Sequence, residues 1–95
     1  MRVVYSKRAL ADLDQIATYY TAHASPTIAE SIGRQLLGAI IRIARHPEAA
    51  PRVSQRTQVR VATVTRYPFR IFYRVNDDRI DILHIRHTSR RPSEM

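Results

Sequence analysis

The stretch from residue 67 to residue 87 reads YPFRIFYRVNDDRIDILHIRH, and it decides the fold. Apolar and polar residues alternate over 69–75, and the turn-forming residues Asn-Asp-Asp at 76–78 separate this run from a second apolar run over 79–86. Alternation with a period of two is typical of a half-buried strand, and Asn and Asp favour tight turns. These residues therefore predict a β-hairpin whose strands cover 69–75 and 79–86.

Two more strands are expected earlier in the chain. The segment 59–64 alternates in the same way, and the segment 2–5 holds the β-branched and aromatic residues that strands favour. Arg60, Arg70 and Arg74 each occupy a position that alternates with apolar residues. The pattern predicts that these three side chains share the face of the sheet that is left open to solvent or to a ligand.

Between these strands, apolar residues recur at three- and four-residue steps, which is the spacing of an amphipathic helix. The first such segment covers 7–22 behind the N-cap residue Ser6, and the second covers 26–46 behind Ser25. The short connection between them predicts an antiparallel helical hairpin. The order strand-helix-helix-strand-strand-strand predicts a single α+β domain over 1–95, with a mostly antiparallel sheet covered on one face by the helical hairpin.

The composition is that of a globular domain with an unusual charge. The 95 residues include 16 Lys and Arg against 8 Asp and Glu, for a formal net charge of +8, and 15 of the 16 basic residues are Arg. Such an excess favours a polyanion or an acidic protein as the partner. There is no signal-peptide pattern and no apolar run near the ~18 residues of a membrane span, so a cytoplasmic protein without membrane contact is expected.

The residue patterns do not point to a metal or a cofactor. His84 and His87 are the two histidines closest in sequence. Three residues apart on a strand, they are predicted to face opposite sides of the sheet, which excludes a shared metal ion. Gly33 and Gly38 both fall inside the second expected helix, so no phosphate-binding glycine loop is present.

Basic residues are concentrated at the end of the last expected strand. The segment 84–91 holds three arginines and two histidines, and guanidinium groups suit the binding of phosphate or carboxylate. His87 has the chemistry of a general acid or base, and Arg90 that of a group that stabilises charge on a reacting phosphate. A purely structural role, in which His87 closes the strand and the last two arginines lie in a tail, fits the same pattern. The residues predicted to contact a target are Arg60, Arg70, Arg74, Arg86, His87, Arg90 and Arg91.

Three segments together resemble the RelE/ParE superfamily of toxins from type II toxin-antitoxin systems. They are RALADL at 8–13, YPFRIFYRV at 67–75 and ILHIRH at 82–87, the last of which is followed by Arg90. The resemblance covers nearly the whole chain and implies the same strand-helix-helix-strand-strand-strand fold. It also implies a toxin that arrests growth and that is neutralised by a cognate antitoxin, which wraps it in a hetero-oligomer.

The superfamily has two main activities. RelE-like members cleave messenger RNA on the ribosome, whereas ParE-like members inhibit DNA gyrase and are not nucleases. Arg70 and Arg90 match two arginines of the RelE-like branch, in which case Tyr73 or His87 has to transfer the protons. The lysines that this branch often carries on the second strand are missing from 59–64, and so is the tyrosine of its C-terminal tail.

The C-terminal pattern is more similar to the ParE-like branch, whose last strand commonly ends in a His before a small residue and an Arg. His87, Thr88 and Arg90 occupy these places. The resemblance therefore favours a non-enzymatic, ParE-like inhibitor of DNA gyrase. The alternatives are a ribosome-dependent endoribonuclease that cleaves messenger RNA, and a non-toxic basic binding module.

Overall fold

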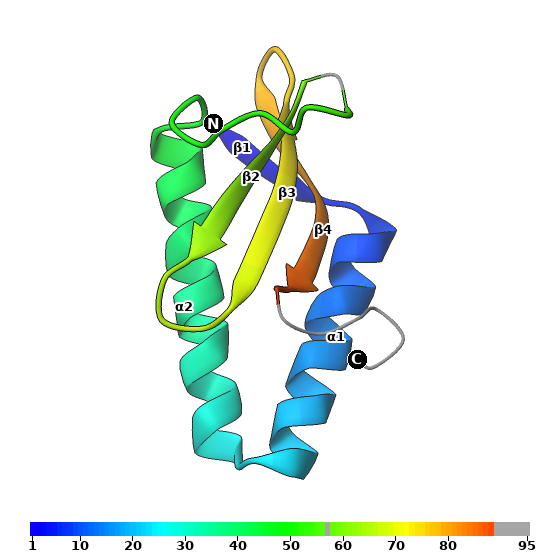
Figure 1. Cartoon of the computed structure of the whole chain (residues 1–95), viewed down its shortest axis with the longest axis vertical. Coiled ribbons are helices and arrows are strands. Elements are labelled where there is room, and N and C mark those ends of the chain that lie inside the picture. The colour runs from blue at the N-terminus through cyan, green and yellow to red at the C-terminus, as the bar shows by residue number, and fades with distance from the viewer. Residues whose placement is uncertain (57, 89–95) are drawn as a thin grey trace.

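The structure is a computed structural model that describes residues 1–56 and 58–88. Its elements follow the predicted order, and their ends agree with the predicted ends to within one residue. The α+β class is confirmed. Along the chain the elements are β1 (Arg2–Tyr5), α1 (Lys7–His23), α2 (Pro26–Arg45), β2 (Val59–Val64), β3 (Phe69–Val75) and β4 (Arg79–His87) (Figure 1).

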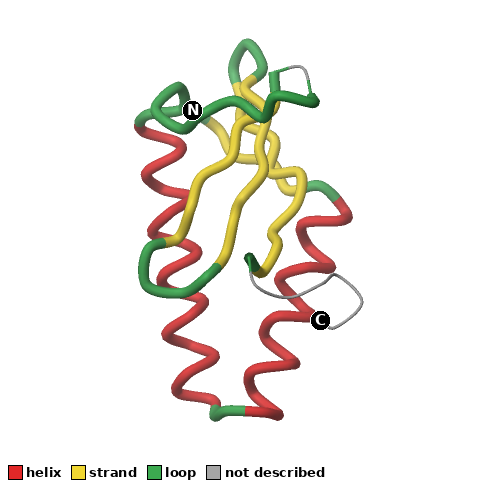
Figure 2. Tube along the Cα trace, in the orientation of Figure 1, coloured by secondary structure: helices red, strands yellow, loops and turns green. Residues whose placement is uncertain are grey.

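Each helix begins behind the serine that the sequence indicates. The Ser6 hydroxyl accepts a hydrogen bond from the Ala9 N–H at 2.9 Å, and the Ser25 hydroxyl accepts one from the Ile28 N–H at 3.1 Å. These bonds satisfy backbone donors that have no partner within the first helical turn. Figure 2 shows α1 and α2 side by side, joined by a short turn, so the helical hairpin is confirmed.

The four strands form one sheet in the order β1-β4-β3-β2. The pairs β2–β3 and β3–β4 are antiparallel, as predicted, whereas β1 lies parallel to β4. The register between β3 and β4 shifts because Phe72 is opposite His84 and Tyr73 is opposite Ile82, which leaves Leu83 as an extra residue on β4. Among the described strands, β4 is therefore an inner strand although it comes last in sequence, and β1 and β2 are the edges.

The helical hairpin covers one face of the sheet, and the core lies between them. Burying each large apolar side chain contributes roughly 1.5–3 kcal/mol, which makes this contact the main source of stability. No helix within residues 1–56 and 58–88 is long and apolar enough to cross a membrane. The buried residues of the core are Ala9, Ile16, Ile32, Leu36, Ala39, Ile40, Ile43, Val64, Phe69, Ile71, Tyr73, Ile80, Ile82 and Ile85.

The predicted orientation of Arg60 is wrong. Arg60 lies directly opposite the buried Tyr73, and residues opposite each other in an antiparallel pair point to the same face. Its guanidinium Nη1 donates hydrogen bonds to the carbonyls of Glu48 at 3.1 Å and Ala50 at 2.7 Å. Arg60 therefore points to the helix-covered side, where the connection between α2 and β2 supplies acceptors for its charge.

Candidate functional site

The face of the sheet that points away from the helices is called the open face below. Along β3 and β4 it is formed by the residues that alternate with the buried core residues. Arg70 and Arg74 lie there, as the sequence predicted. The side chains that β3 and β4 contribute to the open face are Arg70, Phe72, Arg74, Arg79, Asp81, His84 and Arg86.

At the end of the open face near the β3–β4 turn, Asp81 offsets part of the positive charge of Arg74 and Arg79. The Asp81 carboxylate lies 2.9 Å from Nε of Arg79 and also accepts a hydrogen bond from the Asn76 side chain. Arg74 is directly opposite Asp81 in the register. The positive charge at this end is therefore partly neutralised within the protein.

At the other end of the open face, Arg70 and Arg86 form a pair of like charges. They are directly opposite each other on β3 and β4, and both are exposed. Like charges in this arrangement destabilise a sheet. Among the described residues, neither guanidinium makes an ion pair. Two guanidinium groups held together in this way form a ready site for a phosphate or carboxylate group.

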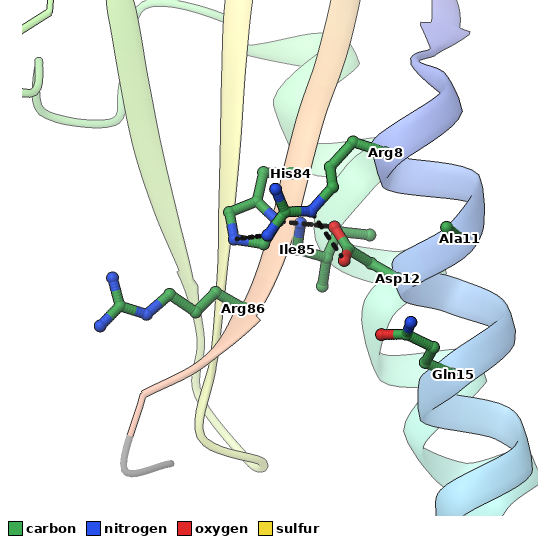
Figure 3. A pocket seen from close by; sticks show the side chains of 7 residues that line it. All are labelled: Arg8, Ala11, Asp12, Gln15, His84, Ile85 and Arg86. Carbon is green, nitrogen blue, oxygen red and sulfur yellow. Dashed lines mark hydrogen bonds and ion pairs between the residues drawn. The ribbon is translucent and has the colours of Figure 1, made fainter. Parts of the chain in front are cut away.

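Beside this pair, Asp12 of α1 lies against the edge of β4, beyond the end of β1 (Figure 3). Its carboxylate is largely buried, accepts a hydrogen bond from the Ile85 N–H at 2.9 Å and lies 2.6 Å from Nδ1 of His84. Nε of Arg8 lies 3.4 Å from the other carboxylate oxygen. Since β1 ends before this point, the Ile85 N–H has no strand neighbour, and Asp12 satisfies it.

Ser6, at the start of α1, also bonds to the edge of β4. Its N–H donates to the Ile82 carbonyl at 3.0 Å, and its hydroxyl donates to the Leu83 carbonyl at 2.8 Å. A pocket of about 250 Å³ follows along the α1–β4 boundary. Figure 3 shows the Arg86 side chain pointing away from Asp12. The pocket is lined by Arg8, Ala11, Asp12, Gln15, His84, Ile85 and Arg86.

The two residues considered as proton-transfer groups point into the protein. Tyr73 is fully buried, and its hydroxyl donates to the Pro47 carbonyl at 2.7 Å. Burial raises the pKa of the Tyr73 phenol, and the nearby positive charge of Arg60 offsets part of that rise. His87 is 5% exposed and packs edge to face against Phe69. Neither ring is placed to exchange a proton with a ligand on the open face.

His84 and His87 lie on opposite faces of the sheet, because they are opposite Phe72 and Phe69 respectively. This confirms the predicted orientation of the two histidines. Arg90 and Arg91 lie outside the described residues.

The sequence interpretation missed the role of Asp12 in the site. Asp12 lies three and four residues from the buried Ala9 and Ile16, so it belongs to the apolar stripe of α1. An acidic residue inside such a stripe indicates a buried partner. His84, its partner, is 72 residues away in the sequence, so the stripe identifies the unusual carboxylate but not what it contacts.

The fold is shared with solved toxin structures. A chain of the chromosomal ParDE toxin-antitoxin system from P. aeruginosa is 28% identical, with a TM-score of 0.83, over 94% of this chain and 97% of that one. The isolated E. coli RelE toxin is 14% identical with a TM-score of 0.60, over 98% of this chain and 89% of that one. A chain of the E. coli RelBE toxin-antitoxin complex is 15% identical with a TM-score of 0.60, over 94% of this chain and 98% of that one. The chain thus has the α+β fold of these toxin-antitoxin proteins.

Residues 3–92 match the family model of the ParE toxin of the type II toxin-antitoxin system, parDE. The chain belongs to the ParE toxin family, which confirms both the resemblance and the preference for the ParE-like branch. A cognate antitoxin is accordingly its partner, and the non-toxic binding module is set aside. No curated protein sequence matches the chain.

Proposed function

We propose that this toxin inhibits DNA gyrase in the cytoplasm by binding through its open face, with Arg70 and Arg86 as central contacts. The observation that carries the proposal is the exposed pair of opposed guanidinium groups, which lacks a counter-ion among the described residues. A bound carboxylate or phosphate group relieves the repulsion between them. Membership of the ParE family supports gyrase as the target.

An inhibitor that acts by binding needs no proton-transfer group on the contact surface. The burial of Tyr73 and His87 on the helix-covered side supports this mode of action. Arg90 and Arg91 remain predicted contacts. Arg74 is left out of the proposed contacts because Asp81 is directly opposite it.

The test is a supercoiling assay in which purified toxin is added to gyrase, ATP and relaxed plasmid. We expect loss of supercoiling or accumulation of cleaved plasmid, and recovery of gyrase activity when the cognate antitoxin is added. Normal supercoiling at a large excess of folded toxin contradicts the proposal.

The Asp12–His84 pair favours one second candidate, a ribosome-dependent endoribonuclease. A carboxylate that orients an imidazole beside two arginines is an arrangement that general-base catalysis uses. However, Nε2 of His84 lies 3.5 Å from Nη2 of Arg8, so a guanidinium group covers the nitrogen that has to accept the proton. In a translating extract, cleavage of messenger RNA that is lost with His84→Gln supports this candidate, and intact messenger RNA excludes it.

A further inference from the structure

We infer that the open face binds single-stranded nucleic acid, with one base stacked on Phe72 and His84 and an adjacent phosphate held between Arg70 and Arg86. The inference deepens the proposed function, since gyrase works on DNA, and it rests on that function for its role in the cell. The binding itself is a property of the toxin alone and can be measured without gyrase.

Phe72 and His84 form an aromatic platform on the open face. They are directly opposite each other on β3 and β4, and their rings are stacked, with centroids 5.8 Å apart and planes 18° from parallel. Both side chains are partly exposed. The bond between His84 and Asp12 restrains the imidazole. A base that stacks here therefore contacts rings that the fold already holds in place, so little ordering is needed on binding.

The platform and the arginine pair are adjacent. Arg70 is two residues before Phe72 on β3, and Arg86 is two residues after His84 on β4. Residues two apart on a strand are separated by about 7 Å, so one nucleotide is able to reach both features. The phosphate then supplies the negative charge that the opposed guanidinium groups lack.

The combination favours nucleic acid over an acidic peptide. Two arginines suffice to bind a carboxylate, but an aromatic platform beside them adds the specific stacking energy when the ligand has a flat π-surface. Cationic grooves with aromatic stacking surfaces are typical of proteins that bind single strands. The bases of a duplex are stacked on each other and cannot lie flat on the sheet, so the ligand we infer is single-stranded.

The experiment measures fluorescence anisotropy of a labelled oligothymidylate of about 12 nucleotides, a length that single-strand binding sites cover. We expect binding that weakens as salt is raised. Replacing both arginines, Arg70→Gln with Arg86→Gln, reduces the slope of log affinity against log salt by about 0.7, the value for the one phosphate that the pair holds. Phe72→Leu weakens binding about tenfold and leaves that slope unchanged, because it removes stacking and not charge.

Arg34→Gln with Arg42→Gln is the matched control, because this α2 pair removes the same two charges from exposed positions outside the open face. The inference is overturned if the oligonucleotide does not bind, or if the α2 pair of replacements weakens binding as much as replacement of Arg70 and Arg86. It is also overturned if polyglutamate or a duplex of equal length binds as tightly. Equal binding of polyglutamate points to an acidic protein segment as the ligand. The comparisons with polyglutamate and with the duplex use the unmodified toxin, so they do not depend on the folding of a variant.

The outcome is separable from that of the gyrase assay. A toxin that stops supercoiling but does not bind the oligonucleotide contradicts this inference and leaves the proposed function standing. A toxin that binds the oligonucleotide through the platform but leaves supercoiling intact contradicts the proposed function and not the binding site.

Discussion

The two faces of β4 contribute differently to the protein. Ile85 and His87 point towards the helices and are 1% and 5% exposed, whereas His84 and Arg86 point to the open face. The covered face stabilises the fold through apolar burial. The open face holds unbalanced positive charge, which costs stability unless a ligand neutralises it. Residues adjacent in the sequence thus separate into those that hold the fold and those available for binding.

The strongest test of this difference uses two neighbouring residues. We expect Ile85→Ala to lower the free energy of unfolding by about 3 kcal/mol, because it leaves a cavity in the core. We expect Arg86→Gln to change it by less than about 0.5 kcal/mol, or to raise it, because the side chain is exposed and repels Arg70. Urea denaturation of both variants measures the values. Similar losses in the two variants contradict the assignment of the faces.

Asp12 connects the two faces, and its removal is expected to have the next largest effect. Asp12→Ala leaves the Ile85 N–H without its acceptor and His84 without its carboxylate, at a cost of about 2 kcal/mol in unfolding free energy. Asp14→Ala, on the same helix but exposed, serves as the control and should cost about 0.5 kcal/mol or less. If thermal or urea unfolding shows equal effects, Asp12 does not stabilise the edge of β4.

On the open face, the expected effect is on target inhibition rather than on stability. Arg70→Gln and Arg86→Gln should each raise the toxin concentration that half-inhibits gyrase by about tenfold, which corresponds to about 1.4 kcal/mol. Arg34→Gln should leave that concentration unchanged. The supercoiling assay gives all three values, and unchanged inhibition by both open-face variants removes these arginines from the contact surface.

The smallest expected effect concerns Tyr73 on the covered face. Because burial raises the pKa of this phenol, the folded protein holds the Tyr73 proton more tightly than the unfolded chain does. This contribution to stability is present below about pH 10, the unfolded value, and is lost as the pH rises through the folded pKa. Tyr73→Phe should reduce the fall in Tm above about pH 10 and cost about 1 kcal/mol at neutral pH through the lost hydrogen bond. An unchanged alkaline profile contradicts this.

Features that depend on nearby residues could be predicted from the sequence. The caps Ser6 and Ser25, the turn at 76–78 and the alternation over 69–75 each have their cause within a few residues, and all are confirmed. The opposed arginines also follow from such patterns once the register of the hairpin is known.

Features that depend on residues distant in the sequence could not be predicted in this way. The segment 59–64 has apolar residues on both sides, so its alternation did not decide where Arg60 points. The carbonyls of Glu48 and Ala50, in an irregular connection, hold that side chain. Likewise, the Asp12–His84 contact exists only because β1 ends early and exposes the edge of β4 to α1.

The position of β4 within the sheet has a consequence for the order of events during synthesis. Of the strands in residues 1–56 and 58–88, β4 is translated last, yet it lies between β1 and β3. The Ser6–Leu83 hydrogen bond joins residues 77 apart. Contacts of such long sequence separation form slowly. A nascent chain therefore exposes the apolar stripes of its helices until residue 87 has left the ribosome, and it is prone to aggregate during that time. Chains released before residue 79 lack one of the two inner strands of the sheet, so we expect them to remain unfolded.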